Sequence, residues 1–207
     1  MTLWAIVPVK PLRRGKSRLS NVLNEDQRTV LNQNMLVNTL KTLTSVKRID
    51  SIMVVSRDPG ALTLAREFGA RTVLEDGNPE LNTALRRAAL IARTYHANEI
   101  LIVPADLPLL TTEEIEQVLA RSGNPPEVII CPDRRKDGTN LLYMNPEGLI
   151  HFNYGGGSFN KHLDQAIKAG VRLEIVETLS IGLDLDVPED LELLKDIQDQ
   201  KNLTINN

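Results

Sequence analysis

Three widely separated segments of this chain carry charged side chains in patterns that suit phosphate chemistry. Five cations crowd one early loop: Lys10, Arg13, Arg14, Lys16 and Arg18. Asp106 follows the apolar run 100–104, and Asp184 and Asp186 form a DxD pattern near the far end of the sequence. Cations and carboxylates of this kind are what a magnesium-assisted reaction on a phosphate-rich substrate requires. The basic loop lacks the glycine and lysine spacing of a Walker A motif, so we expect a different phosphate-binding loop.

Two further segments combine small residues with hydroxyl groups, as anion-binding loops do. The segment 137–140 reads Asp-Gly-Thr-Asn, and 155–158 reads Gly-Gly-Gly-Ser directly before a predicted helix. Backbone N–H groups at a helix start bind anions, and we expect Ser158 to cap this helix. Asp-Gly is also an ordinary turn signal, and a glycine run can be a flexible loop, so both interpretations stay open. His162, one turn into the helix, is expected at the surface.

Length and composition are those of an ordinary globular protein. The chain has 207 residues, of which 42% are hydrophobic and 25% charged. This length allows one α/β core but is short for two, so we predict a single domain over 1–207 with a frayed tail at 202–207. The only cysteine, Cys131, excludes an intrachain disulfide, and no Cys/His cluster predicts a zinc site.

Charge and hydropathy exclude several classes of partner. A net charge of −3 and an aromatic content of 3% argue against nucleic-acid binding. No apolar stretch approaches the roughly 20 residues of a membrane helix, and the first apolar run is too short for a secretion signal. We therefore expect a soluble cytoplasmic protein with no membrane partner. Its oligomeric state is open, a homodimer included.

Strand-like and helix-like segments alternate along most of the sequence. The predicted strands are 3–9, 49–56, 72–74, 99–104, 128–131, 139–144 and 171–176. The predicted helices begin near 24 and 111 and span 59–68, 81–97, 158–169 and 188–198. This alternation predicts a single-domain three-layer α/β/α fold with a mainly parallel sheet.

The predicted sheet would bring the charged segments together. Ligands of such sheets bind beyond the carboxyl ends of the strands, and the loops at Lys10, Asp106 and Asp184 all fall on that edge. Alternation along a strand would point Asp184 and Asp186 to the same face. Asn82, at the start of a helix, could hold a nucleotide base through its amide, although Asn is also a common N-cap.

Taken in order, these motifs resemble one enzyme family, the 2-phospholactate/phosphoenolpyruvate guanylyltransferases of coenzyme F420 biosynthesis. This family belongs to the nucleotidyltransferases similar to molybdenum-cofactor guanylyltransferases, with a nucleotide-diphospho-sugar transferase-like fold. The motifs are Ala5-Ile-Val-Pro-Val-Lys-Pro-Leu, Gly15-Lys16-Ser-Arg18-Leu, Leu81-Asn82-x-Ala-Leu, Pro104-Ala-Asp106-Leu-Pro-Leu, Asp137-Gly138-Thr139-Asn140, Gly155-Gly-Gly-Ser158-Phe-x-x-His162 and Asp184-Leu-Asp186-x-Pro-Glu-Asp-Leu. One departure is Glu80, at a place where this family often has glycine.

The resemblance implies transfer of GMP from GTP to a small phosphorylated acid, phosphoenolpyruvate or 2-phospho-L-lactate, with release of pyrophosphate and with Mg²⁺ as cofactor. The resemblance implies that Lys16 touches phosphate and the acceptor. With the basic loop and the amide considered above, the candidate nucleotide-binding residues are Lys10, Arg13, Lys16, Arg18 and Asn82. The implied acceptor-binding residues are Thr139, Gly155 and Ser158. The implied catalytic residues are Lys16, Asp106 and Asp186. Asp106 and Asp186 would hold Mg²⁺, with Asp184 as the alternative second ligand.

Two other functions remain open. A glycosyltransferase that uses a nucleotide sugar also holds its metal with DxD, although the basic loop suits a triphosphate better than a diphosphate sugar. A nucleotide-binding protein without turnover is the second alternative. The metal-site prediction requires the acids to meet. A distance above about 10 Å from Asp106 to both Asp184 and Asp186 would exclude a shared ion.

Overall fold

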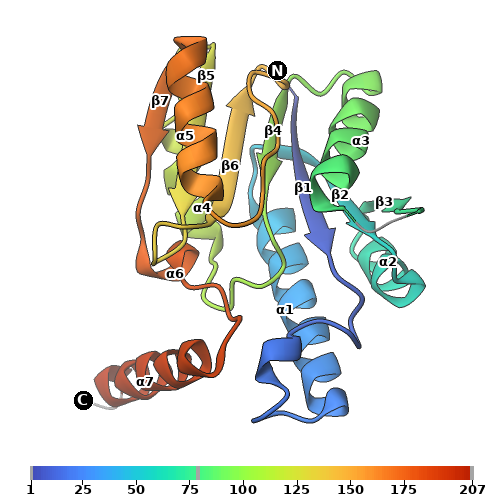
Figure 1. Ribbon diagram of the computed structural model, residues 1–207, viewed down its shortest axis with the longest axis vertical. Coiled ribbons are helices and arrows are strands. Elements are labelled where there is room, and N and C mark those ends of the chain that lie inside the picture. The colour runs from blue at the N-terminus through green and yellow to red at the C-terminus, as the bar shows by residue number, and fades with distance from the viewer. Residues whose placement is uncertain (1, 78–79, 206–207) are drawn as a thin grey trace.

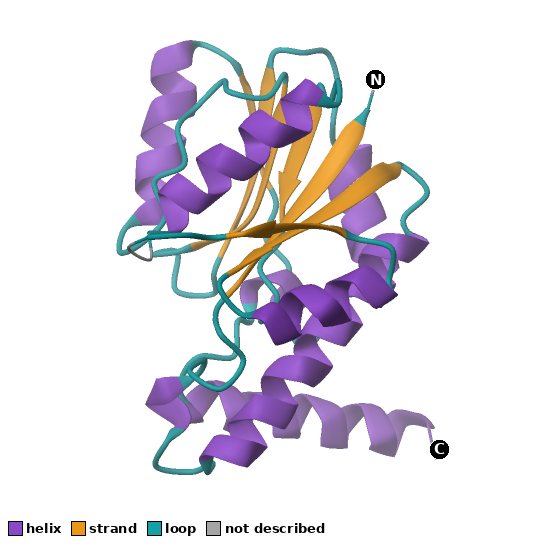
Figure 2. Cartoon of the chain, turned by 90° about the vertical axis from the view of Figure 1, so that its right-hand side faces the viewer, coloured by secondary structure: helices purple, strands orange, loops and turns teal. Residues whose placement is uncertain are grey.

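One seven-stranded sheet forms the centre of the molecule (Figures 1 and 2). The structure is a computed structural model that describes residues 2–77 and 80–205, with side chains as far as residue 200. The strands are β1 (Leu3–Val9), β2 (Ile49–Ser56), β3 (Arg71–Leu74), β4 (Glu99–Ile102), β5 (Glu127–Pro132), β6 (Thr139–Asn145) and β7 (Arg172–Ile175). Their order is β3-β2-β1-β4-β6-β5-β7, and only β6 pairs antiparallel, with both β4 and β5. The predicted mainly parallel α/β fold is confirmed.

Helices cover both faces of the sheet, as Figure 2 shows. They are α1 (Glu25–Ser45), α2 (Pro59–Glu67), α3 (Leu81–Thr94), α4 (Thr112–Ala120), α5 (Ser158–Ala169), α6 (Leu179–Gly182) and α7 (Pro188–Ile205), with a 3-10 turn η1 (Ser17–Leu19) before α1. Leu40 of α1 belongs to the core on one face and Leu85 of α3 to the core on the other. Burial of one such side chain contributes about 1.5–3 kcal/mol. None of the described helices is long and apolar enough to cross a membrane.

Several helix ends follow the predicted signals, and others do not. Asn24 and Gln27 form the expected reciprocal capping box at the start of α1, and Thr111 caps α4. The helix predicted to reach residue 97 ends at Thr94, and the strand predicted to reach 104 ends at Ile102. The predicted tail overlaps the last helix, because α7 continues to Ile205, while 206–207 lie outside the described residues.

The segment around the DxD pattern is not the predicted strand. Residues 179–182 form the short helix α6, and 183–187 are irregular. Other loops hold this segment in place, since Leu185 N–H donates to Asp106 O at 3.0 Å and Arg134 N–H to Gly182 O at 2.8 Å. Apolar and acidic residues nevertheless alternate in burial along this segment. Leu183 and Leu185 are buried in a cluster with Leu19, Met35 and Leu194, whereas Asp184 and Asp186 between and after them are half-buried.

The topology explains why distant segments meet at one edge of the sheet. The parallel strands β1 and β4 end there, before the loops that contain Lys16 and Asp106. Because β6 runs antiparallel to β4, its first residue, Thr139, lies at the same edge. This edge therefore collects both the predicted charged groups and the predicted anion-binding hydroxyl.

Candidate active site

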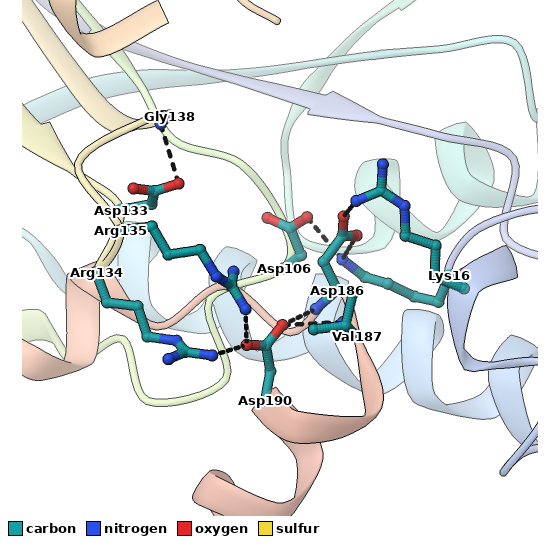
Figure 3. Close-up of polar contacts among 10 residues, drawn as sticks. Lys16, Asp106, Asp133, Arg134, Arg135, Gly138, Asp186, Val187 and Asp190 are labelled. Carbon is teal, nitrogen blue, oxygen red and sulfur yellow. Dashed lines mark hydrogen bonds and ion pairs between the residues drawn. The ribbon is translucent and has the colours of Figure 1, made fainter. Parts of the chain in front are cut away.

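An ionic cluster joins three segments that are far apart in the sequence (Figure 3). Lys16 Nζ donates to Asp106 Oδ2 at 2.7 Å and to Asp186 Oδ1 at 3.3 Å. Arg18 Nη1 donates to the other oxygen of Asp186 at 3.2 Å. The two carboxylates thus share one ammonium nitrogen, so Asp106 and Asp186 are much closer than the distance of about 10 Å that would exclude a shared ion. The structure brings together Lys16, Asp106 and Asp186, as the sequence predicts.

Lys16 is the buried member of this cluster. Only 6% of its side chain is exposed, and its backbone is left-handed with φ at 56°. Burial alone would lower the pKa of Lys16, but the carboxylates of Asp106 and Asp186 outweigh it and raise the pKa above its ordinary value. The ammonium group therefore stays charged at neutral pH. Removing one partner of a buried ion pair lowers the free energy of unfolding by about 3–5 kcal/mol.

Asp190 fixes the backbone beside this cluster and was not predicted to have a role in the site. Its Oδ2 accepts hydrogen bonds from Asp186 N–H and Val187 N–H, each at 2.9 Å. Its Oδ1 accepts from Arg134 at 2.6 Å and Arg135 at 3.0 Å (Figure 3). The side chain of Asp190 is fully buried. The sequence indicates only a favourable helix-dipole position for Asp190. Its arginine partners lie more than fifty residues away, so no local pattern reveals those two contacts.

Asp184 has a different environment from Asp186. Its Oδ1 is buried and has no hydrogen-bond partner among the described residues. Burial, and then the nearby Asp106 carboxylate, raise the pKa of Asp184 above its ordinary value. A buried carboxylate beside a second carboxylate needs a cation or a proton.

These residues fit a magnesium ion that is completed by substrate. Within the described residues, no group of three or more His, Cys, Asp or Glu side chains is arranged to hold a metal ion. Mg²⁺ in phosphate-transferring enzymes is commonly held by one or two carboxylates together with substrate phosphates. Asp106 and the unpartnered oxygen of Asp184 are the groups that could supply the protein's share of such a site.

The two predicted anion-binding loops are bonded to each other. Thr139 N–H donates to Ser158 Oγ at 2.9 Å, and Gly157 N–H donates to Asp137 Oδ1 at 3.1 Å. Ser158 is therefore not the helix cap that the sequence predicts. Gly157 takes the N-cap position of α5 with φ at 70°, and the Ser158 hydroxyl is used between the loops. We name these two loops, residues 137–140 and 153–158, the hydroxyl cradle.

His162 lies beneath the hydroxyl cradle, and its predicted surface position is wrong. Its side chain is fully buried. The ring Nδ1 lies 2.9 Å from Thr139 Oγ1, and Nε2 accepts from Asn153 N–H at 2.9 Å. The ring faces the sheet because α5 packs over β5, with Phe159 on the same inward side. One turn of spacing from Ser158 was the only sequence signal for this placement.

A cleft of about 370 Å³ opens beside the ionic cluster. Lys10, Lys16 and Asp106 line it, together with apolar side chains from β1, β2 and α3. Arg13 and Arg18 are not among the residues lining it, and Arg13 is 74% exposed with a 3.8 Å contact to Glu25. Gly15 also lines the cleft, where a Cβ atom would meet the Asn32 side chain at 2.6 Å.

Glu80 and Asn82 both stabilise the start of α3. Glu80 Oε1 accepts from Asn82 N–H at 3.0 Å and Oε2 from Thr83 N–H at 2.7 Å, so Glu80, not Asn82, is the cap. These bonds, the Thr83 hydroxyl first, lower the pKa of Glu80. The Asn82 amide instead holds the backbone of Tyr154, donating to its O at 3.2 Å and accepting from its N–H at 2.7 Å.

Comparison with known proteins identifies the family. The family model described as guanylyl transferase CofC like matches residues 3–202. The chain belongs to this family. A phosphoenolpyruvate guanylyltransferase from Rubrobacter xylanophilus is 38% identical over 195 residues, which cover 94% of each chain. A 2-phospho-L-lactate guanylyltransferase from Methanocaldococcus jannaschii is 39% identical over 189 residues, covering 90% of this chain and 79% of the relative.

Solved structures similar to this CofC-like chain share its fold at low sequence identity. A nucleotidyl transferase from Methanothermobacter has a TM-score of 0.69 and 17% identity, covering 97% of this chain and 99% of that one. A CMP:2-keto-3-deoxy-manno-octonic acid synthetase, solved with CTP, has a TM-score of 0.63 and 14% identity, covering 97% and 100%. These structures support the nucleotidyltransferase fold.

Proposed function

We propose that this protein transfers GMP from GTP to phosphoenolpyruvate or 2-phospho-L-lactate, with release of pyrophosphate, in coenzyme F420 biosynthesis. One observation carries the proposal: the buried Lys16 lies between Asp106 and Asp186 at the edge of the cleft. Its relatives' names supply the substrates, since the two that we compared are guanylyltransferases for these two acids. Both acids present a phosphate and a carboxylate, so the residues do not choose between them.

The cleft would hold the nucleotide. Its apolar wall can cover a base, and Lys10 and Lys16 at its edge can bind the phosphates. Arg13 and Arg18, which are exposed, would attract the outer phosphates through solvent. Asn82 would act indirectly, because both ends of its amide already hold Tyr154.

Glu75 is the residue we favour for reading guanine. It lines the cleft on the loop after β3, and its Oε1 accepts from Glu80 N–H at 3.1 Å. Among the described residues, no donor is bonded to its other carboxylate oxygen. Guanine presents two adjacent N–H donors, N1–H and the N2 amino group, whereas adenine has an acceptor nitrogen and a C–H group at the same positions. A carboxylate would therefore favour GTP over ATP.

The hydroxyl cradle would bind the acceptor. Thr139 and Ser158 provide hydroxyl groups, and the backbone N–H groups of Gly155 and Gly156 have no acceptor among the described residues. Hydroxyl and N–H donors at the start of α5 suit a phosphate or carboxylate. We propose that Thr139, Gly155 and Ser158 contact it directly.

Asp106 and Asp184 would hold Mg²⁺. The unpartnered buried oxygen of Asp184 favours it over Asp186, whose two oxygens are both paired with cations. Asp186 would then orient Lys16 and Arg18. Bound there, the metal would neutralise phosphate charge and draw the reacting groups together.

The reaction needs no covalent nucleophile from the protein. An oxygen of the acceptor phosphate forms a bond to the α-phosphorus of GTP, and the bond from that phosphorus to the bridging oxygen breaks, so pyrophosphate leaves with the electron pair. The hydroxyl cradle positions the acceptor for in-line attack, and Lys16 offsets the charge that builds on the leaving group. Loss of one such preorganised group costs about 3 kcal/mol, roughly a hundredfold in rate.

Pyrophosphate release tests the proposed function. The purified protein is incubated with Mg²⁺ and GTP, and with phosphoenolpyruvate, 2-phospho-L-lactate or 3-phosphoglycerate in turn. ATP and CTP are run as nucleotide controls. We expect release only with GTP and an acceptor. In Asp106→Asn we expect a loss of roughly a hundredfold or more in a protein that still unfolds cooperatively.

The alternatives predict different outcomes. A glycosyltransferase would release a nucleoside diphosphate from a nucleotide sugar and no pyrophosphate from GTP. A binding protein without turnover would bind GTP and form no product. Near-full activity of Asp106→Asn would remove its proposed catalytic role.

A further inference from the structure

The buried ring of His162 bonds to the hydroxyl cradle through both of its nitrogens. Nδ1 lies 2.9 Å from Thr139 Oγ1, and Nε2 lies 2.9 Å from the backbone nitrogen of Asn153. Thr139 is 5% exposed and His162 fully buried, so water does not compete at the ring. Tyr154 packs edge-on against the ring at 5.1 Å between centroids.

These two contacts allow one protonation state. A backbone N–H can only donate, so Nε2 must accept from Asn153 and cannot carry a proton. The neutral ring then carries its proton on Nδ1 and donates it to Thr139 Oγ1. A doubly protonated ring would place two N–H groups against each other. Burial, with a smaller effect of Lys161, lowers the pKa of His162 to about 4, which also keeps the ring neutral at neutral pH.

The direction of this bond determines what the Thr139 hydroxyl can do. Its oxygen accepts from His162, and its own proton has no acceptor among the described residues. Ser158 has the same arrangement, because its hydroxyl oxygen accepts from Thr139 N–H and its proton remains available. Two hydroxyl groups of one cradle are therefore both set to donate. An anion, which only accepts, is the ligand that such a pair matches.

We propose that His162 is a positioning residue that presets the Thr139 hydroxyl as a hydrogen-bond donor to the anionic group of the acceptor. This inference rests on the proposed function, in which Thr139 contacts the acceptor. His162 does not touch the substrate. Because the His162 N–H group donates to Thr139 Oγ1, the hydroxyl cannot direct its lone pairs at an anion. The acceptor therefore binds without first reorienting the hydroxyl group.

Two substitutions separate this role from support of the fold. An Asn amide nitrogen can take the place of Nδ1, so His162→Asn keeps a donor to Thr139. A Gln amide reaches the position of Nε2, so His162→Gln keeps a partner for Asn153 and loses the donor. We expect His162→Gln to raise the acceptor KM about tenfold and leave the GTP KM within about twofold, with His162→Asn within about threefold of wild type. His151→Gln is the matched control, because His151 is exposed.

A double-mutant cycle decides whether His162 acts through Thr139. Thr139→Val removes the hydroxyl, and in that background His162→Gln should raise the acceptor KM by less than about twofold further. Effects that multiply fully would overturn the proposal, since they would mean independent action. A parallel rise of both KM values in His162→Gln would also overturn it.

Nitrogen NMR of the wild-type histidine side chains gives a test without turnover. The chain has three histidines, and His162→Asn assigns the buried one. We expect its proton on Nδ1 and a bare Nε2, unchanged when inorganic phosphate or phosphoenolpyruvate is added. A proton on Nε2 would overturn the proposal.

Acceptor binding measured by calorimetry without GTP separates the two proposals. Binding that weakens in His162→Gln, in a protein that forms no product, would contradict the proposed function and support the role of His162. Product formation by wild type, with acceptor binding unchanged in His162→Gln, would overturn the role of His162 alone. Wild-type protein that forms no product and binds no acceptor would overturn both.

Discussion

The ionic cluster and the hydroxyl cradle lie at the same edge of the sheet but are held by different forces. Lys16, Asp106 and Asp186 come from distant segments and hold each other by charge. Thr139 and His162 belong to segments only 23 residues apart and are held by neutral, buried hydrogen bonds. The carboxylates of the cluster are each 31% exposed, whereas the His162 ring is fully buried.

This difference indicates how each region responds to its ligands. Charges that pair only with each other can exchange partners when a phosphate or a metal ion arrives, so the ionic cluster should respond to salt and Mg²⁺. Thr139 and Ser158 of the hydroxyl cradle, and the neutral His162 ring beneath it, carry no charge that could exchange partners, and the Asp137 carboxylate accepts from Gly157 N–H within the cradle. Its contribution comes from preset hydrogen-bond directions, which should respond to protonation of the ring.

The largest expected effect tests the ionic cluster through Lys16→Ala. The substitution removes the ammonium that separates Asp106 from Asp186 and leaves two carboxylates facing each other without it. We expect pyrophosphate release to fall by roughly a hundredfold or more. Thermal unfolding should show a folded protein, and a variant within tenfold of wild-type activity would contradict the role assigned to Lys16.

The next effect concerns the stability of the hydroxyl cradle at low pH. The folded pKa of His162 is lowered to about 4, while an unfolded histidine titrates near its ordinary value of 6.5. When the pH is below 6.5, His162 of the unfolded chain takes up a proton, but the buried ring of the folded protein does not. Protonation therefore favours the unfolded chain, and the free energy of unfolding decreases as the pH falls from 6.5 toward the folded pKa. When the pH falls from about 7.5 to about 5, the free energy of unfolding should decrease by about 2 kcal/mol more in the wild type than in His162→Asn.

Urea unfolding of both proteins across this pH range measures the difference. The other two histidines are present in both proteins and cancel in the comparison. Parallel stability curves for wild type and His162→Asn would show that the ring is not held neutral in the fold.

The same contrast explains what the sequence could predict. Strand and helix periodicity predicted the sheet and its helices, and the types of Lys16, Asp106 and Asp186 predicted a charged site at one edge. The role of His162 and the contacts of Asp190 with Arg134 and Arg135 could not be predicted, because packing between elements brings these partners together. Ser158 shows the limit most directly: its local pattern fits a helix cap, yet a backbone N–H from β6 takes its hydroxyl.

The dependence of activity on Mg²⁺ concentration should distinguish the role of Asp184 from that of Asp186. Asp184 has the unpartnered buried oxygen, and Asp186 is paired with Lys16 and Arg18. We expect Asp184→Asn to raise the Mg²⁺ concentration for half-maximal activity by about tenfold, comparable to the weakest losses seen when a metal site is disturbed. Asp186→Asn should lower activity at saturating Mg²⁺ with a smaller shift in that concentration. The reverse pattern would assign Asp186 as the metal ligand.

The smallest expected effect comes from Arg13, which lies in the same basic loop as Lys16. Its side chain is 74% exposed, and its 3.8 Å contact with the exposed Glu25 is a weak surface pair. An exposed cation can attract GTP only through water and salt, so Arg13→Ala should change the GTP KM by less than about threefold in 0.15 M salt. Repeating the assay at low salt should enlarge the effect, because screening is weaker there. A loss as large as that of Lys16→Ala would mean that the loop closes over the nucleotide and buries Arg13. The ionic cluster would then extend beyond Lys16, Arg18 and the two carboxylates, which hold it without ligand.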